Sequence, residues 1–370
     1  MVFSPEIKKN FGFGCMRLKN EDNIVDLDEF SKMVDLFIAS GFNYFDTAHG
    51  YLNGNSETAV RECLAKRYDR SEFILTDKLS DGFFEKEEDI KPLFSAQLEA
   101  CGVEYFDFYL FHAVNGRNYE KYKATNAFGV AQELKKDGKI KHVGMSFHDN
   151  ARVLDKILSE QPTIEVVQLQ FNYLDYDSPV VESRECYEVC KKHGKRVIVM
   201  EPVRGGKLVR LPDEAKEVFD ALGGTYAGYA IRYCASFDNI FMVLSGMETV
   251  DMVAENVNVM KDFQPLSAEE NEAVDKVRAI LKKQNEIPCT ACRYCTDGCP
   301  AEIPIPDIIA CYNSKTAHQN WDGKWFYNNR TNGKGKASDC IQCGQCEYIC
   351  PQHLNIREVL ENAAQVFDND

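Results

Sequence analysis

The chain has 370 residues, 44% of them hydrophobic and 27% charged, a composition typical of soluble globular proteins with room for one large and one small domain. Its formal net charge of −15 argues against nucleic acid or an anionic membrane as a main partner. The sequence shows no secretory signal and no apolar stretch of bilayer length. Its 15 cysteines suit a reducing compartment, so we expect a cytoplasmic protein.

Patterns typical of buried strands alternate with amphipathic helical patterns over most of the chain. The expected strands are 11–18, 42–46, 72–78, 106–112, 142–147, 166–172, 196–202 and 241–246, and the expected helices are 26–40, 56–68, 89–102, 127–138, 150–160, 179–194, 225–236 and 249–260. Near-continuous apolar strands are typical of parallel strands covered on both faces. Eight strand–helix units predict an α/β fold of the (β/α)8 TIM-barrel type, with a doubly wound open sheet as the alternative.

The pattern changes after one further amphipathic helix at 267–284, where a cysteine-rich segment begins. We therefore expect a barrel domain over residues 1–284 and a second domain over residues 285–370. No long Gly/Ser linker separates the two, which predicts that the second domain packs on the first. Residues 306–319 have a helical pattern, so the second domain is expected to be small and mainly helical.

Eight of the fifteen cysteines form two runs of identical spacing, each followed by proline. The runs are Cys289-x2-Cys292-x2-Cys295-x3-Cys299 and Cys340-x2-Cys343-x2-Cys346-x3-Cys350. This is the bacterial two-cluster [4Fe–4S] ferredoxin spacing, in which the fourth cysteine of each run ligates the other cluster. We therefore expect a ferredoxin-like domain with one cluster on Cys289, Cys292, Cys295 and Cys350 and the other on Cys340, Cys343, Cys346 and Cys299.

Disulfides and structural zinc fit the two runs less well than iron–sulfur clusters do. A disulfide framework needs an oxidising compartment, and structural zinc uses CxxC pairs rather than two matched runs of four. The seven cysteines outside the runs are expected to be small buried core residues. Cys186 and Cys190 are spaced i, i+4 on an expected helix, a spacing that can also bind metal.

Polar residues occur at the carboxyl ends of the expected strands, where barrel enzymes carry their catalytic groups. Asp46 ends the second strand and Tyr51 follows it, while Lys78 and His112 end the next two. Tyrosine has a pKa of about 10, which a nearby ammonium group lowers by stabilising the phenolate. A histidine can orient a substrate carbonyl. Together these residues suit protonation of a carbonyl oxygen while hydride reaches the carbonyl carbon. Taken one at a time, each residue is also compatible with a purely structural role.

A longer motif contains these residues: Asp46-Thr-Ala-x-x-Tyr51 followed by Ser56-Glu57, with Lys78 and Phe111-His112 at the next strand ends. This motif resembles the aldo-keto reductase family, and the resemblance extends over residues 11–284. It implies a (β/α)8 barrel, NAD(P)H as cofactor and a small-molecule carbonyl or alcohol as substrate. It also implies that Tyr51 is the general acid, tuned by Lys78 and Asp46, and that His112 orients the substrate carbonyl.

The same resemblance implies a set of cofactor-binding positions, namely Ser146, Gln168, Met200, Arg204, Gly205, Glu255 and Asn256. The first two match residues that grip the nicotinamide amide, and Met200 stands where an aromatic ring usually stacks. Arg204 and Gly205 begin a turn suited to a pyrophosphate, since glycine permits close backbone approach. An ordinary tight turn is the alternative there.

Besides Met200, three positions depart from the family pattern. Phe147 stands where an asparagine is expected, and Gly246 and Met252 stand where family members carry the lysine and arginine that bind the 2′-phosphate of NADPH. NADH and a flavin in the same groove are therefore alternatives to NADPH.

Three hypotheses connect the two redox systems, since a nicotinamide moves two electrons as hydride whereas a [4Fe–4S] cluster moves one. In the first, the barrel exchanges electrons with the clusters through a flavin, and an external electron carrier is a partner. In the second, the barrel is an ordinary carbonyl reductase with structural clusters. In the third, the protein is an electron carrier whose barrel is inactive.

The cysteine-rich segment is expected to lie near the C-terminal face of the barrel. Aldo-keto reductases fold the segment after the last barrel helix over the barrel mouth, and here that segment begins the second domain. Its aromatic residues are candidates for this contact, with the core of the small domain as the alternative: Trp321, Trp325, Phe326 and Tyr327.

Overall fold

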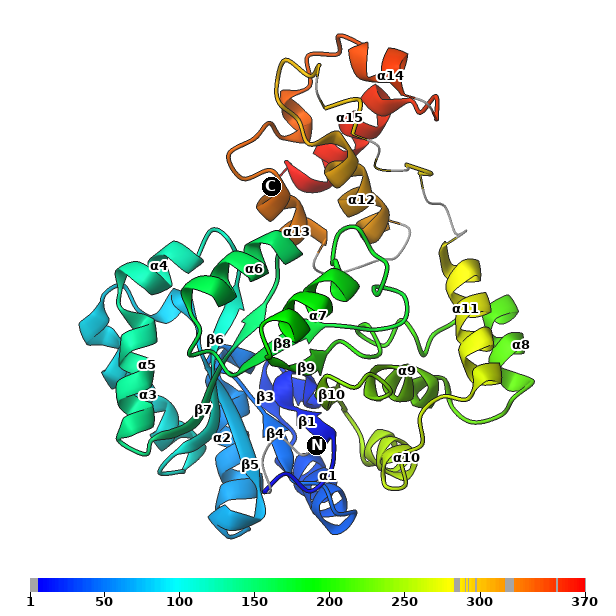
Figure 1. Cartoon of the computed structure of the whole chain (residues 1–370). Coiled ribbons are helices and arrows are strands. Elements are labelled where there is room, and N and C mark those ends of the chain that lie inside the picture. Colours follow the sequence, from blue (N-terminus) through cyan, green and yellow to red (C-terminus); the bar gives the residue numbers. More distant parts are fainter. Residues whose placement is uncertain are drawn as a thin grey trace.

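A closed barrel of eight parallel strands forms the larger part of the molecule (Figure 1). The computed structural model describes residues 6–282, 287–289, 291, 293–296, 298–316, 323–350 and 352–369. The barrel strands are β1 (Phe11–Gly14), β4 (Tyr44–Asp46), β5 (Ile74–Leu79), β6 (Phe106–Val114), β7 (Ile140–Phe147), β8 (Val166–Gln170), β9 (Arg196–Met200) and β10 (Ile240–Gly246). From β4 to β10 each strand pairs with the next in sequence, and β10 closes on β1. The (β/α)8 barrel is thus confirmed over the open sheet.

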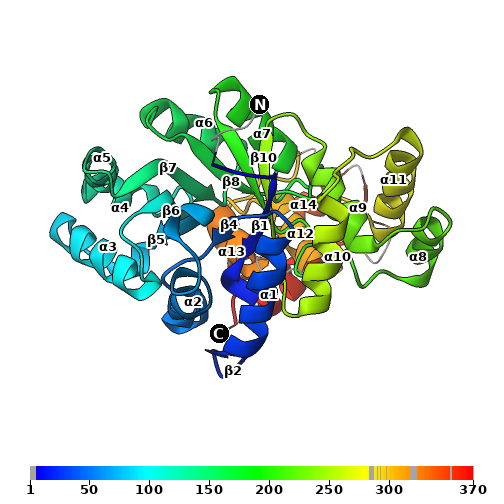
Figure 2. The same cartoon turned by 90° about the horizontal axis from the view of Figure 1, so that it is seen from below.

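Helices surround the barrel (Figures 1 and 2). They are α1 (Leu27–Ala39), α2 (Asn55–Val60), α3 (Glu87–Cys101), α4 (Tyr119–Ala124), α5 (Ala127–Lys136), α6 (Ala151–Glu160), α7 (Ser183–Lys192), α8 (Asp213–Asp220), α9 (Tyr226–Ala235), α10 (Val250–Met260) and α11 (Ala268–Lys282). The sequence patterns did not indicate α4, α8 or the short hairpin of β2 (Asn20–Glu21) and β3 (Ile24–Val25).

Local sequence signals explain several helix boundaries. The Asp26 side chain accepts a hydrogen bond from the backbone N–H of Glu29 and so caps α1. Helix α3 ends at Gly102, whose φ of 68° is a left-handed conformation that glycine adopts without strain. The helix expected at 56–68 is shorter, because α2 passes into a π-helical turn at Arg61–Ala65.

Large aromatic side chains fill the space between the sheet and its helices. Phe13 lies 5.5 Å from Phe37 and 5.9 Å from Phe45, measured between ring centroids, and all three are fully buried. A second cluster includes Tyr44, Phe108 and other buried residues of the barrel strands. Burial of this kind, worth about 1.5–3 kcal/mol for each large side chain, holds the strand ends in fixed positions.

The small domain lies above the barrel in Figure 1, and its helices are α12 (Ile305–Thr316), α13 (Gly323–Arg330), α14 (Gln345–Ile349) and α15 (Ile356–Phe367). It has its own hydrophobic core, which also takes in Val180 and Val181 from the loop between β8 and α7. The side chain of Arg330 donates to the carbonyl of Val180 over 2.9 Å and pairs with Glu182 at 3.1 Å. The segment therefore packs on the C-terminal face, as expected.

Phe326 and Tyr327 belong to the core of the small domain, whereas the half-buried Trp325 faces the barrel. Trp321 lies outside the described residues, as does the expected domain boundary between residues 284 and 285. None of the described helices is both long and apolar enough to cross a bilayer.

Candidate active site

Three of the four predicted catalytic residues are joined by hydrogen bonds at the C-terminal end of the barrel. The Nζ of Lys78, at the end of β5, donates to Asp46 Oδ1 over 2.6 Å and to the Tyr51 hydroxyl over 3.2 Å. It also donates to the carbonyl oxygen of Thr47 over 2.7 Å. The ammonium group is fully buried and has three acceptors, so its position is fixed relative to the phenol.

The charges of this group follow from burial and pairing. Burial disfavours the Lys78 ammonium, but the adjacent Asp46 carboxylate outweighs it and raises the lysine pKa. Burial raises the pKa of Tyr51 more than the lysine lowers it. The net shift is therefore opposite to the one that the lysine alone would give. Tyr51 keeps its proton at neutral pH and is able to donate it.

His112 lies beside the phenol as a neutral imidazole. Its ring centroid is 5.7 Å from that of Tyr51, and its Nδ1 is 2.6 Å from the Ser80 hydroxyl. Burial and the Lys78 charge hold the pKa of His112 well below its usual range. The Ser80 contact orients the ring, and a neutral imidazole is able to hydrogen-bond a carbonyl oxygen.

A cavity of about 330 Å³ opens at this face, with Asp46, Tyr51 and His112 on its wall. Ser146, Gln168 and Met200 also line it. The Ser146 hydroxyl accepts from the backbone N–H of Ala113 over 2.8 Å, and the Gln168 amide donates to Asp46 over 3.2 Å. Three of the predicted cofactor residues are therefore gathered beside the predicted tetrad.

The remaining predicted cofactor residues do not line this cavity. The Arg204 side chain makes a buried ion pair with Asp175, 3.0 Å between Nη2 and Oδ1. Gly205 lies against the side chains of Arg17 and Glu201. On α10, Glu255 is exposed and Asn256 donates to the Ser245 hydroxyl over 3.2 Å.

Three further cavity residues were not assigned from the sequence, and a fourth, Trp325, was expected only as a contact to the barrel face. Arg17 lies beside Gly246 and pairs with Glu201 at 3.2 Å, so this pair forms one part of the cavity wall. His148 and Trp325 form another part of the wall, with ring centroids 4.7 Å apart at 88°. The motif Ser146-Phe147-His148 carried a signal for one of them, since the histidine follows a strand end directly.

The described cysteines of the two runs line two small cavities in the small domain. Cys289, Cys295 and Cys350 line one, while the other is lined by Cys299, Cys340, Cys343 and Cys346. Cys292 lies outside the described residues. Among the described cysteines, the last one of each run thus lies with the earlier ones of the other run, the grouping that exchanged ligands predict. A donor set made of thiols around a small enclosed space fits an iron–sulfur cluster.

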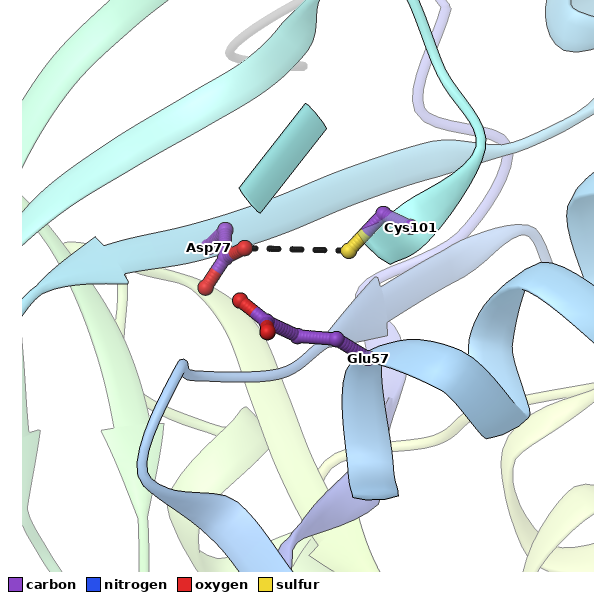
Figure 3. A group of neighbouring side chains, drawn as sticks. All are labelled: Glu57, Asp77 and Cys101. Carbon is purple, nitrogen blue, oxygen red and sulfur yellow. Dashed lines mark hydrogen bonds between the residues drawn. The ribbon is translucent and has the colours of Figure 1, made fainter. Parts of the chain in front are cut away.

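The seven remaining cysteines are buried, as expected for core residues. One of them, Cys101, lies beside the two buried carboxyl groups of Glu57 and Asp77 (Figure 3). Its thiol donates to Asp77 over 3.7 Å, and Asp77 is hydrogen-bonded to Glu57. Burial raises the pKa of the Cys101 thiol and of both carboxyls, that of Glu57 to about 7. Because these groups hold protons, the cluster suits a hydrogen-bonded carboxyl pair better than a cation site.

Comparison with known protein families identifies both the barrel and the cysteine-rich domain. An aldo/keto reductase family model matches residues 10–279, and the model of a 4Fe–4S dicluster domain matches residues 288–355. The chain belongs to the aldo/keto reductase family. It is an oxidoreductase whose barrel is followed by a 4Fe–4S dicluster domain.

Individual relatives resemble this aldo/keto reductase over its barrel. L-galactose dehydrogenase from Arabidopsis thaliana is 25% identical over 293 residues, 73% of this chain and 90% of that protein. The holo form of an aldo-keto reductase from Bacillus halodurans is 27% identical, with a TM-score of 0.58 and coverage of 72% and 91% of the two chains. An aldo-keto reductase from Klebsiella pneumoniae in complex with NADPH is 18% identical and shares the fold, with a TM-score of 0.61 and coverage of 73% and 90%.

Proposed function

We propose that the barrel interconverts a carbonyl compound and its alcohol with Tyr51 as general acid and base. The observation that carries this proposal is the hydrogen-bonded chain from Asp46 through Lys78 to the Tyr51 hydroxyl, which ends at the cavity beside His112. In the reducing direction Tyr51 donates its proton to the carbonyl oxygen, and the Lys78 charge stabilises the phenolate that remains. His112 donates a hydrogen bond that orients the same oxygen.

A nicotinamide dinucleotide, when bound, supplies the hydride that reaches the carbonyl carbon. Ser146 and Gln168 would hold its amide, and Met200 would pack on its ring as a polarisable side chain. Gly246 and Met252 offer no cation for a 2′-phosphate. We therefore expect NADH to bind at least as tightly as NADPH, measured by fluorescence titration of the purified protein with each. A flavin spectrum in the purified protein would contradict this cofactor proposal.

We also propose that the small domain holds two [4Fe–4S] clusters, one on Cys289, Cys292, Cys295 and Cys350 and the other on Cys340, Cys343, Cys346 and Cys299. Bound clusters supply one-electron storage. Trp325 joins the cavity to the small domain, because it lines the cavity and its ring centroid lies 5.7 Å from that of Phe326 in the core of the small domain. Iron analysis and an anaerobic absorption spectrum test the number of clusters.

Replacement of Tyr51 by phenylalanine tests the catalytic proposal. We expect the turnover number for carbonyl reduction to fall by about 10²–10⁴-fold, the usual contribution of a positioned general acid. Tyr173→Phe is the matched control, because Tyr173 is buried and its hydroxyl has no hydrogen-bond partner among the described residues. Iron content should be unchanged in both variants. Equal turnover in Tyr51→Phe and the wild type would favour the inactive-barrel hypothesis instead.

A further inference from the structure

His148 differs from the other described histidines that are not exposed. His49, His112, His142 and His193 each have a ring nitrogen within 3.0 Å of a side-chain oxygen. The Nδ1 of His148 is shielded from solvent and has no hydrogen-bond partner among the described residues. Because a shielded nitrogen is out of reach of a ligand, Nε2 is the ring nitrogen left to bind one in the cavity that His148 lines.

The ring of His148 is nevertheless held in place. Its backbone N–H donates to the carbonyl of Val114 over 2.9 Å, and its carbonyl accepts from the side chain of Asn329 over 3.2 Å. Trp325 packs against the ring edge to face. A fixed imidazole costs little entropy when it meets a ligand, which is the property of a preorganised binding group.

His148 shares its cavity with Tyr51 and His112. Burial and the Lys78 charge lower the pKa of His148 to about 4, so its ring is neutral at pH 7 and its Nε2 is a donor in one tautomer and an acceptor in the other. Neighbouring polar groups on the cavity wall have protein partners already. Gln168 donates to Asp46, and Arg17 pairs with Glu201.

We propose that His148 binds a second oxygen of an uncharged substrate whose carbonyl is reduced at Tyr51 and His112. The substrate class is then a hydroxycarbonyl or dicarbonyl compound, since a neutral imidazole accepts from a hydroxyl or donates to a second carbonyl. This inference rests on the proposed carbonyl reduction. A carboxylate substrate is disfavoured because the cations that line or approach the cavity, Lys78 and Arg17, are paired with Asp46 and Glu201.

The test compares two ketones of matched size, hydroxyacetone and 2-butanone, which differ by a hydroxyl in place of a methyl group. The kcat/KM of each is measured with NADH and NADPH for the wild type, His148→Leu and His148→Asn. We expect the wild type to prefer hydroxyacetone and His148→Leu to reduce the hydroxyacetone-to-butanone ratio by about tenfold or more. The loss should appear mainly in KM, because the contact is made equally before and during the reaction.

The ratio separates binding of an oxygen from damage to the fold, because a merely structural role would lower both activities together. His148→Asn, which keeps a donor and an acceptor, should recover part of the ratio. His193→Leu, on the surface beside Asp155, is the control and should leave both activities unchanged. An unchanged ratio in His148→Leu, or a wild type that prefers pyruvate to hydroxyacetone, would overturn the inference while carbonyl reduction stands. Absence of turnover of all these ketones by the cluster-loaded wild type would instead overturn the proposed function.

Discussion

The barrel and the small domain are stabilised in different ways. Every barrel strand is hydrogen-bonded to a neighbour on both sides, and fully buried phenylalanines lie between sheet and helices. The described helices of the small domain have 5 to 12 residues, and its core includes the buried cysteines Cys295, Cys346 and Cys350. We therefore expect the barrel to fold alone, and we expect folding of the small domain to depend on what its cysteines bind.

Removal of iron should produce the largest difference in stability between the two domains, larger than that from any single substitution in the barrel. We expect anaerobic chelation, or Cys346→Ser, to unfold helices α12 to α15 and to leave the barrel folded. Hydrogen exchange of the two domains measures this. Cys311→Ala is the control, because Cys311 is buried in α12 but belongs to neither cysteine run. Retained protection of α12 to α15 without iron would show that their hydrocarbon core suffices.

Lys78→Met tests whether the barrel can be destabilised without the small domain. It leaves the Asp46 carboxylate buried without its cation, which costs about 3–5 kcal/mol of unfolding free energy. Adding Asp46→Leu should restore most of that stability but no activity, since Tyr51 still lacks the ammonium. Both tryptophans lie beyond residue 320, so tryptophan fluorescence follows the small domain while circular dichroism follows mainly the barrel. A shift of both signals together would contradict independent folding.

Arg330→Ala tests the contact between the two parts. The Arg330 side chain is 9% exposed and bonds to Val180 and Glu182, so its removal should cost roughly 1–3 kcal/mol at the interface. We expect the denaturation curves from fluorescence and circular dichroism to separate further, and KM to rise because Trp325 is less firmly held. Lys334→Ala, an exposed neighbour, is the control and should do neither.

Glu57→Gln should have the smallest effect on stability, and this effect should be confined to the barrel. Burial raises the pKa of Glu57 from 4.5 to about 7, so the folded protein keeps a proton that the unfolded chain releases. The contribution of Glu57 to stability is then fully present below pH 4.5 and is lost as the pH rises through about 7. The glutamine variant does not titrate, so its thermal midpoint should change less between about pH 5.5 and 8, by roughly 2–4 °C. If the thermal midpoints of variant and wild type changed with pH in the same way, Glu57 would not hold the extra proton.

The barrel was predictable from the sequence because its parallel strands are apolar throughout and alternate with helices. The grouping of the described cysteines was also predictable, because the two-cluster motif assigns the last cysteine of each run to the other cluster. Long-range contacts outside such a motif were not predictable. Nothing near Arg204 in the sequence indicates that it pairs with Asp175, and nothing near Trp325 indicates that it reaches His148. The hydrogen bond from Asn256 to Ser245 likewise depends on how α10 packs.

Because Trp325 belongs to the small domain, the cavity of the barrel is completed only after the second domain has been synthesised. During translation the barrel emerges first and is able to close before residue 325 is made. The cavity gains this wall only when the small domain has folded, which on the prediction above follows delivery of iron and sulfide. A chain still awaiting them would hold Tyr51 and Lys78 in place but leave the cavity wider. Metal insertion would thus complete the pocket as the last step of maturation.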